Sequence, residues 1–251
     1  MQGLLALLDD RRPRLTLDES LIGTNPGLGF RPISSRTEEG SLIWYDIQNH
    51  TTSNKWVNLL DEFLDSYVQN QTGKNYQHCD FNRTADDGNV CMVDLEQFGP
   101  CSPTNVYGYN GSSPCVFLKL NKIYGWEPEY YTEYVEEMPE ELQIKINNTE
   151  PSERNQVWIS CEGTNPVDKE NLHGFEYHPK RGFPSYYFPY TNTPNYLSPL
   201  IAVQVLNPQP NVLISVECRA WAKNINYRGG DLQREGSISF EILIDDKDQK
   251  E

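Results

Sequence analysis

The chain has 251 residues, 37% of them hydrophobic, and a formal net charge of −15. This length and apolar content suffice for one large or two small domains with a sizeable core, so disorder is not the default. The negative charge would repel the phosphates of nucleic acids and of anionic lipids. The sequence therefore predicts no nucleic-acid partner and no electrostatic docking on lipid.

The chain starts with a short apolar segment, residues 1–8, which is too short to cross a bilayer. We interpret this segment as the outer end of a truncated transmembrane helix in a longer type II membrane protein. A disordered or amphipathic start is the alternative. Residues 9–40 are charged and then rich in glycine and proline, which predicts an extended arm on a surface rather than a domain.

Residues 41–251 are expected to form a single extracellular domain that contains one amphipathic helix, at about 53–69. Ser53 is a suitable N-cap, and large apolar side chains follow it at steps of three and four residues. We expect this stripe to pack against a sheet; a partner-binding face is the alternative. The stripe consists of Trp56, Leu60, Phe63, Leu64 and Tyr67.

The six cysteines are an even set without the CxxC spacing of zinc sites or redox dithiols, which favours an oxidising compartment. Four of them lie in the loop-rich stretch 79–115, where little core can form. Six cysteines allow fifteen pairings. Nearest-neighbour pairing would close two loops there of about a dozen residues, each bond stabilising the fold by roughly 3 kcal/mol. The cysteines are Cys79, Cys91, Cys101, Cys115, Cys161 and Cys218.

The second half of the chain alternates between apolar and polar residues in short segments separated by turns. Candidate strands cover residues 115–120, 142–146, 157–161, 211–222 and 237–244. Cys161 and Cys218 fall on the apolar faces of their strands, so a disulfide between them could cross the core between two sheets. We predict a mainly β fold, an immunoglobulin-like antiparallel β-sandwich with one inserted α-helix and disulfide-stapled loops.

Five Asn-X-Ser/Thr acceptors are present, about twice the number expected by chance from this composition. Each could carry a glycan on a surface loop. Together with paired cysteines they indicate an extracellular chain. The acceptors are Asn49, Asn70, Asn82, Asn110 and Asn147.

No catalytic motif is recognisable: HExxH, GxSxG and a Walker glycine loop are all missing from the sequence. His173 and His178 are the nearest histidine pair, but their spacing makes a poor metal site. A glycosidase pair of carboxylates, which has no sequence signature, is the remaining enzymatic alternative. The sequence predicts no catalytic residue, no metal and no cofactor.

Residues 183–205 are the predicted functional centre. Their first half holds four prolines, which exclude a helix and favour an exposed loop. Tyr186, Tyr187 and Tyr190 on such a loop offer apolar faces with polar tips, which is typical of a protein-contact surface. The alternative is that these tyrosines only cap one end of the sandwich. The prolines are Pro184, Pro189, Pro194 and Pro199.

Three phrases in the second half of the chain, FPSYYFPY, NYLSPLIAVQV and ISVECRAWAKNI, resemble the β subunit of the sodium/potassium-transporting ATPase. The phrase GTNPGLGFRP resembles its arthropod, nervana-like members, and the resemblance implies that residues 9–40 are the family's juxtamembrane arm. The segment VCMVDLEQFGPCS resembles the family segment in which one disulfide ends and the next begins. The resemblance implies sequential pairing, Cys79–Cys91, Cys101–Cys115 and Cys161–Cys218.

The resemblance further implies a non-catalytic, glycosylated subunit that supports the assembly, export and potassium occlusion of a catalytic α subunit. It implies a plasma-membrane location with single-pass type II topology and this chain outside the cell. A third, small regulatory subunit is a further partner that the family brings into consideration. The alternatives are a homophilic cell-adhesion ectodomain and the β subunit of a proton/potassium pump. The implied α contacts are Tyr186, Tyr187, Pro189, Tyr190, Ala202, Val203 and Gln204.

Overall fold

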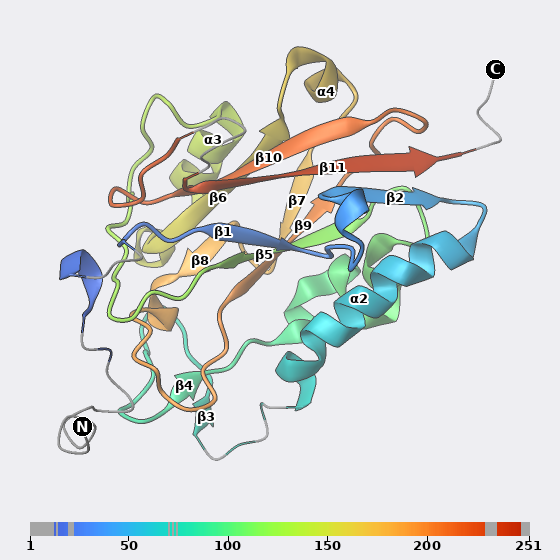
Figure 1. Ribbon diagram of the computed structural model, residues 1–251. Coiled ribbons are helices and arrows are strands. Elements are labelled where there is room, and N and C mark those ends of the chain that lie inside the picture. The colour runs from blue at the N-terminus through green and yellow to red at the C-terminus, as the bar shows by residue number, and fades with distance from the viewer. Residues whose placement is uncertain are drawn as a thin grey trace.

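Two sheets packed face to face form the body of the protein, which is represented by a computed structural model (Figure 1). The structure describes residues 13, 15–19, 23–69, 71, 73, 75–228 and 235–246. The first sheet has the strand order β1-β5-β9-β7 and the second β2-β11-β10-β6-β8. The predicted mainly β sandwich is thus confirmed. Residues 1–8, Asn70 and the first part of the predicted arm lie outside the described residues.

The strands of the first sheet are β1 (Leu28–Arg31), β5 (Cys115–Leu120), β7 (Phe175–His178) and β9 (Leu200–Val205). Those of the second are β2 (Leu42–Asp46), β6 (Gln156–Gly163), β8 (Gly182–Pro184), β10 (Ile214–Trp221) and β11 (Ser237–Asp245). A small ribbon joins β3 (Tyr76–Gln77) to β4 (Val90–Cys91). The α-helices are α2 (His50–Gln69), α3 (Glu140–Asn148) and α4 (Pro166–Glu170).

Alternation along the strands builds the core between the sheets. Every second residue of β10 is buried from Ile214 to Cys218, and β11 repeats the pattern from Phe240 to Ile244. The central strand β5 is buried on both faces, because the 3-10 segments η4 (Leu95–Cys101) and η5 (Pro103–Gly108) cover its outer face. There Phe117 contacts Phe98 and Tyr107, with ring centroids 5.6 and 5.9 Å away.

The pairing departs from a wholly antiparallel sandwich at two places. Strand β2 runs parallel to β11, and β3 runs parallel to β4. Almost two hundred residues separate β2 from β11 in the chain, so no hairpin turn dictates their relative direction. The remaining pairs of strands in the two sheets are antiparallel.

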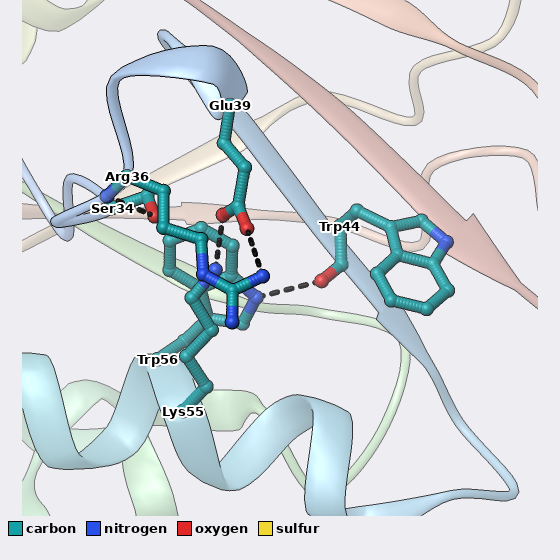
Figure 2. A network of polar contacts seen from close by, with 6 residues as sticks. All are labelled: Ser34, Arg36, Glu39, Trp44, Lys55 and Trp56. Carbon is teal, nitrogen blue, oxygen red and sulfur yellow. Dashed lines mark hydrogen bonds and ion pairs between the residues drawn. The ribbon is translucent and has the colours of Figure 1, made fainter.

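Helix α2 runs along the free edge of β2 (Figure 1), and its apolar stripe packs into the main core. The Trp56 indole donates to the backbone oxygen of Trp44 at 2.7 Å, and the Thr52 hydroxyl accepts from the Asp46 amide at 2.9 Å. Figure 2 shows this edge together with Glu39, which pairs with Lys55. These contacts satisfy edge groups that could otherwise pair with another chain. The helix begins three residues before Ser53, which therefore lies inside it.

The strand predicted at 142–146 is wrong, because this segment forms helix α3. Leu142 and Ile146 are both 0% exposed, whereas Ile144 between them is 52% exposed. Glu140 and Glu141 lie in the first turn, where carboxylates interact favourably with the helix dipole. The buried face completes a second small core with Met138, Trp158 and Trp221. With α4, the structure describes three α-helices in place of the single one predicted.

The disulfide between Cys161 and Cys218 does not cross between the sheets, so that expectation is wrong. The two cysteines lie directly opposite each other on the neighbouring strands β6 and β10, with 4.0 Å between their Cα atoms. Both side chains do point into the core, which is why the alternation pattern placed them there. In the part of the chain that the structure describes, no helix has the length and apolar composition needed to cross a bilayer.

Candidate functional site

The segment between β8 and β9, residues 185–199, is here named the aromatic loop. Apart from one 3-10 turn, Ser185–Tyr187, it has no regular structure, as its prolines require. The Tyr187 hydroxyl donates to the backbone oxygen of Met92 at 2.6 Å. The Tyr186 ring contacts Phe81 edge to face at 5.4 Å. The first half of the loop is thus fixed to the chain around the β3–β4 ribbon.

The second half of the aromatic loop is held by the same ribbon. The Tyr76 hydroxyl donates to the backbone oxygen of Asn195 at 2.6 Å. The side-chain amide of Asn75 donates to the backbone oxygen of Pro194 at 2.9 Å. The Tyr196 hydroxyl returns to the backbone oxygen of Tyr187 at 3.2 Å. The loop is therefore a constrained surface whose conformation is set before any partner arrives.

A third set of contacts joins the aromatic loop to residues 122–126. Gly125 donates its amide proton to the Tyr190 oxygen at 2.8 Å, and Trp126 meets Phe188 edge to face at 5.8 Å. Tyr190 and Tyr196 contact each other with ring centroids 4.9 Å apart. The rings of Phe188, Tyr190 and Tyr196 are partly exposed, whereas Trp126 is buried.

Tyr186, Tyr187 and Tyr196 of the loop are neutral at physiological pH. Burial, with the nearby carboxylate of Asp80, raises the pKa of Tyr186 to about 12. Burial also raises the pKa of Tyr187 and of Tyr196 above the ordinary value. None of these hydroxyls is poised to act as a base near pH 7. The arrangement suits recognition through ring faces and hydrogen bonds rather than proton transfer.

A cleft of about 320 Å³ lies between the aromatic loop and the turn that precedes β4. Residues 84–91 form one wall, and Tyr186 to Pro189 with Tyr196 form the other. The Cys79–Cys91 disulfide closes the loop that carries the first wall. Such a cleft could accept a side chain or short loop of another protein.

The predicted contacts on β9 separate into buried and accessible residues. Ala202 and Val203 are 0% exposed, because β9 is an inner strand between β5 and β7. Their side chains therefore cannot touch a partner of the folded chain. Gln204 is partly exposed and donates to the Ser113 backbone oxygen at 3.2 Å. The prediction missed this difference because a resemblance in sequence does not separate core positions from surface ones.

The six cysteines are joined in sequential order as Cys79–Cys91, Cys101–Cys115 and Cys161–Cys218. The second bond fastens the end of η4 to the start of β5. The four glycosylation acceptors within the described residues are all exposed: Asn49, Asn82, Asn110 and Asn147. Asn147 lies on α3 and not on a loop.

Sequence reasoning missed several residues that shape the site. Phe81, Met92 and Trp126 contact the aromatic loop from segments far from it in the chain, and no local pattern marks them. Tyr196 belongs to the same Tyr- and Pro-rich segment, so the composition of that segment could have identified it. Among the described residues, no group of three or more His, Cys, Asp or Glu side chains could hold a metal ion.

Comparison with known proteins places this architecture in a family. The family model described as the sodium/potassium ATPase beta chain matches residues 1–240. A sodium/potassium-transporting ATPase subunit beta-1 of Drosophila melanogaster is 49% identical, over 98% of this chain and 79% of that protein. The subunit beta-2 of the same organism is 46% identical, again over 98% of this chain and 79% of that protein. A probable subunit beta-3 of Caenorhabditis briggsae is 31% identical, over 97% and 73%. The chain therefore belongs to the sodium/potassium ATPase beta chain family.

Proposed function

We propose that this protein is the non-catalytic β subunit of a sodium/potassium-transporting P-type ATPase. It binds the catalytic α subunit, and it thereby supports the assembly, export and potassium occlusion of the pump. The observation that carries the proposal is the family match over nearly the whole chain. No bond is made or broken by this subunit: it stabilises the folded partner and favours those states of the pump with which it makes the better contacts.

The accessible part of the predicted contact set is the surface that we assign to the α subunit. It comprises Tyr186, Pro189 and Tyr190 on the aromatic loop and Gln204 on β9, all of them partly exposed. Half-buried aromatic rings on a pre-formed loop lose little conformational entropy on binding, which favours affinity. Tyr187 has a supporting role in this assignment, because its hydroxyl is engaged with Met92.

The proposed topology is that of a plasma-membrane type II protein, with residues 9–40 as a juxtamembrane arm and residues 41–251 outside the cell. Three disulfides and four exposed glycosylation acceptors support an extracellular position. A third, small regulatory subunit of the pump is included as a further partner.

The test is co-expression of the full-length protein with the catalytic α subunit of a sodium/potassium pump, followed by affinity purification in mild detergent. We expect a large partner that forms a sodium-dependent phosphoenzyme with ATP. The double variant Tyr186→Ala/Tyr190→Ala should lower the yield of this partner. Tyr134→Ala, at another exposed aromatic residue (47% exposed), is the matched control and should leave it unchanged. A well-folded, glycosylated protein that recovers no phosphorylated partner contradicts the proposal.

A further inference from the structure

Three cations lie close together beside the aromatic loop. Arg31 ends strand β1, Lys119 lies on the neighbouring strand β5, and Lys122 lies two residues after the end of β5. Arg31 and Lys122 are exposed, and Lys119 is half-buried. Within the described part of the chain, none of the three forms an ion pair with a carboxylate. This is unusual in a chain whose Asp and Glu outnumber its Lys and Arg by 36 to 21.

Aromatic rings accompany these cations. The Arg31 guanidinium and the Lys119 ammonium both lie over Phe63 of helix α2, at 5.7 and 5.9 Å from the ring centroid. Lys122 lies over Tyr190 and Tyr196, at 5.1 and 5.6 Å. We name these six residues, Arg31, Phe63, Lys119, Lys122, Tyr190 and Tyr196, the cation–aromatic strip. It links helix α2 to the aromatic loop across the ends of β1 and β5.

The strip holds like charges that no carboxylate among the described residues pairs with. Burial, followed by the repulsion of Arg31 and Lys122, lowers the pKa of Lys119. Cation–aromatic contacts at exposed sites contribute only about 0.5–1 kcal/mol each, and they leave the positive charge in place. A carboxylate placed among these groups would relieve the repulsion and gain charge-assisted hydrogen bonds. The strip is therefore electrostatically complementary to an acidic segment that the described part of the chain does not supply.

We propose that the cation–aromatic strip docks an acidic polypeptide segment, rich in Asp or Glu, of the catalytic subunit. The inference rests on the proposed function and specifies the chemistry of the contact beyond the aromatic loop. Two features favour a polypeptide of that subunit as the occupant. The strip is continuous with the aromatic loop through Tyr190 and Tyr196, and its rings offer the mixed apolar and cationic surface typical of protein interfaces.

The experiment is carbodiimide coupling of the full-length co-expressed complex, which joins lysine amines directly to carboxylates in contact with them, followed by peptide mass spectrometry. We expect Lys122 or Lys119 to be coupled to an Asp or Glu of the catalytic subunit. Lys145, exposed on α3 at the outer face of the second sheet, is the matched control and should couple to no residue of that subunit.

Two sets of variants separate charge from reactivity. Lys119→Arg/Lys122→Arg keeps the charge but has no amine to couple, so the complex should form normally while the coupled peptide disappears. Lys119→Glu/Lys122→Glu should lower the recovery of the catalytic subunit about fivefold. The loss should be greater in low salt than in 0.5 M choline chloride, because the Debye length falls to about 4 Å there. Lys145→Glu should recover as much of the catalytic subunit as the unchanged protein does. Lys119→Met/Lys122→Gln removes the two charges and keeps the side-chain length. Its recovery of the catalytic subunit should fall between that of the Glu variant and that of the unchanged protein, as a graded effect of charge requires.

The outcomes are distinct. If the complex forms and phosphorylates, but both lysines couple only within this chain or to a lipid headgroup, the strip does not bind the catalytic subunit and this inference is overturned while the proposed function stands. Recovery unchanged by the Glu variant overturns it as well. If the unchanged protein recovers no catalytic subunit at all, the proposed function fails first, and this inference falls with it.

Discussion

At the scale of single residues, the tyrosine hydroxyls of the aromatic loop differ in whether they bond to a distant segment or only to a near neighbour. The Tyr187 hydroxyl donates to Met92 at 2.6 Å across 95 residues of chain, whereas the Tyr190 hydroxyl reaches only Asn192, two residues away. Tyr187→Phe should therefore lower the free energy of unfolding by about 1 kcal/mol, since the Met92 oxygen is left without this donor. Urea denaturation measures the change.

Tyr190→Phe is the matched control for this prediction, because its hydrogen bond is local and exposed. Its effect should stay within about 0.5 kcal/mol. Equal losses of stability in the two variants would contradict the view that Tyr187 anchors the loop and Tyr190 serves the surface.

The same residues mark the limit of sequence reasoning at this scale. The prolines and tyrosines of residues 183–205 predict an exposed aromatic loop without reference to any other segment. The direction of each ring depends on Phe81, Met92 and Trp126, which tertiary structure alone brings into contact with it. For the same reason the burial of Ala202 and Val203 could not be predicted: a phrase shared with a family carries no information on the neighbours of β9.

At the scale of elements, helix α3 separates two interpretations of one pattern. The spacing of Leu142, Ile144 and Ile146 fits a strand, but in a helix residues four apart share a face and residues two apart do not. The structure buries Leu142 and Ile146 and exposes Ile144. The longer strands β10 and β11 were predictable because their alternation extends over eight or nine residues, which no amphipathic helix imitates.

This difference makes a sharp prediction. Leu142→Ala should destabilise the protein by about 2–5 kcal/mol, because it opens a cavity beside Trp158 and Trp221. Ile144→Ala should change the free energy of unfolding by less than about 0.5 kcal/mol, because its side chain is largely in water. Urea unfolding followed by tryptophan fluorescence measures both. A strand would bury all three side chains on one face and give similar losses at both positions.

At the scale of the whole molecule, the three disulfides stabilise different parts of the sandwich. Cys161–Cys218 spans 57 residues that include α4, the aromatic loop and β9, and it lies in the core. Cys79–Cys91 spans 12 residues outside the two main sheets and closes one wall of the cleft. The loop-entropy model assigns roughly 4 kcal/mol to the first bond and roughly 3 kcal/mol to the second. Of these two bonds, only Cys161–Cys218 constrains strands that form the core between the two sheets.

Removal of the two bonds should therefore have different consequences. The Cys161→Ala/Cys218→Ala variant should lower the urea midpoint of the entire sandwich. The Cys79→Ala/Cys91→Ala variant should move that midpoint less, since residues 79–91 can open while the two sheets remain folded. It should instead increase protease cleavage within residues 79–91 and weaken the recovery of the catalytic subunit, because the wall facing Tyr186 is released. If the Cys79→Ala/Cys91→Ala variant gave the larger fall in midpoint, the ribbon would be part of the cooperative core, and the cleft would be as rigid as the sheets that support it.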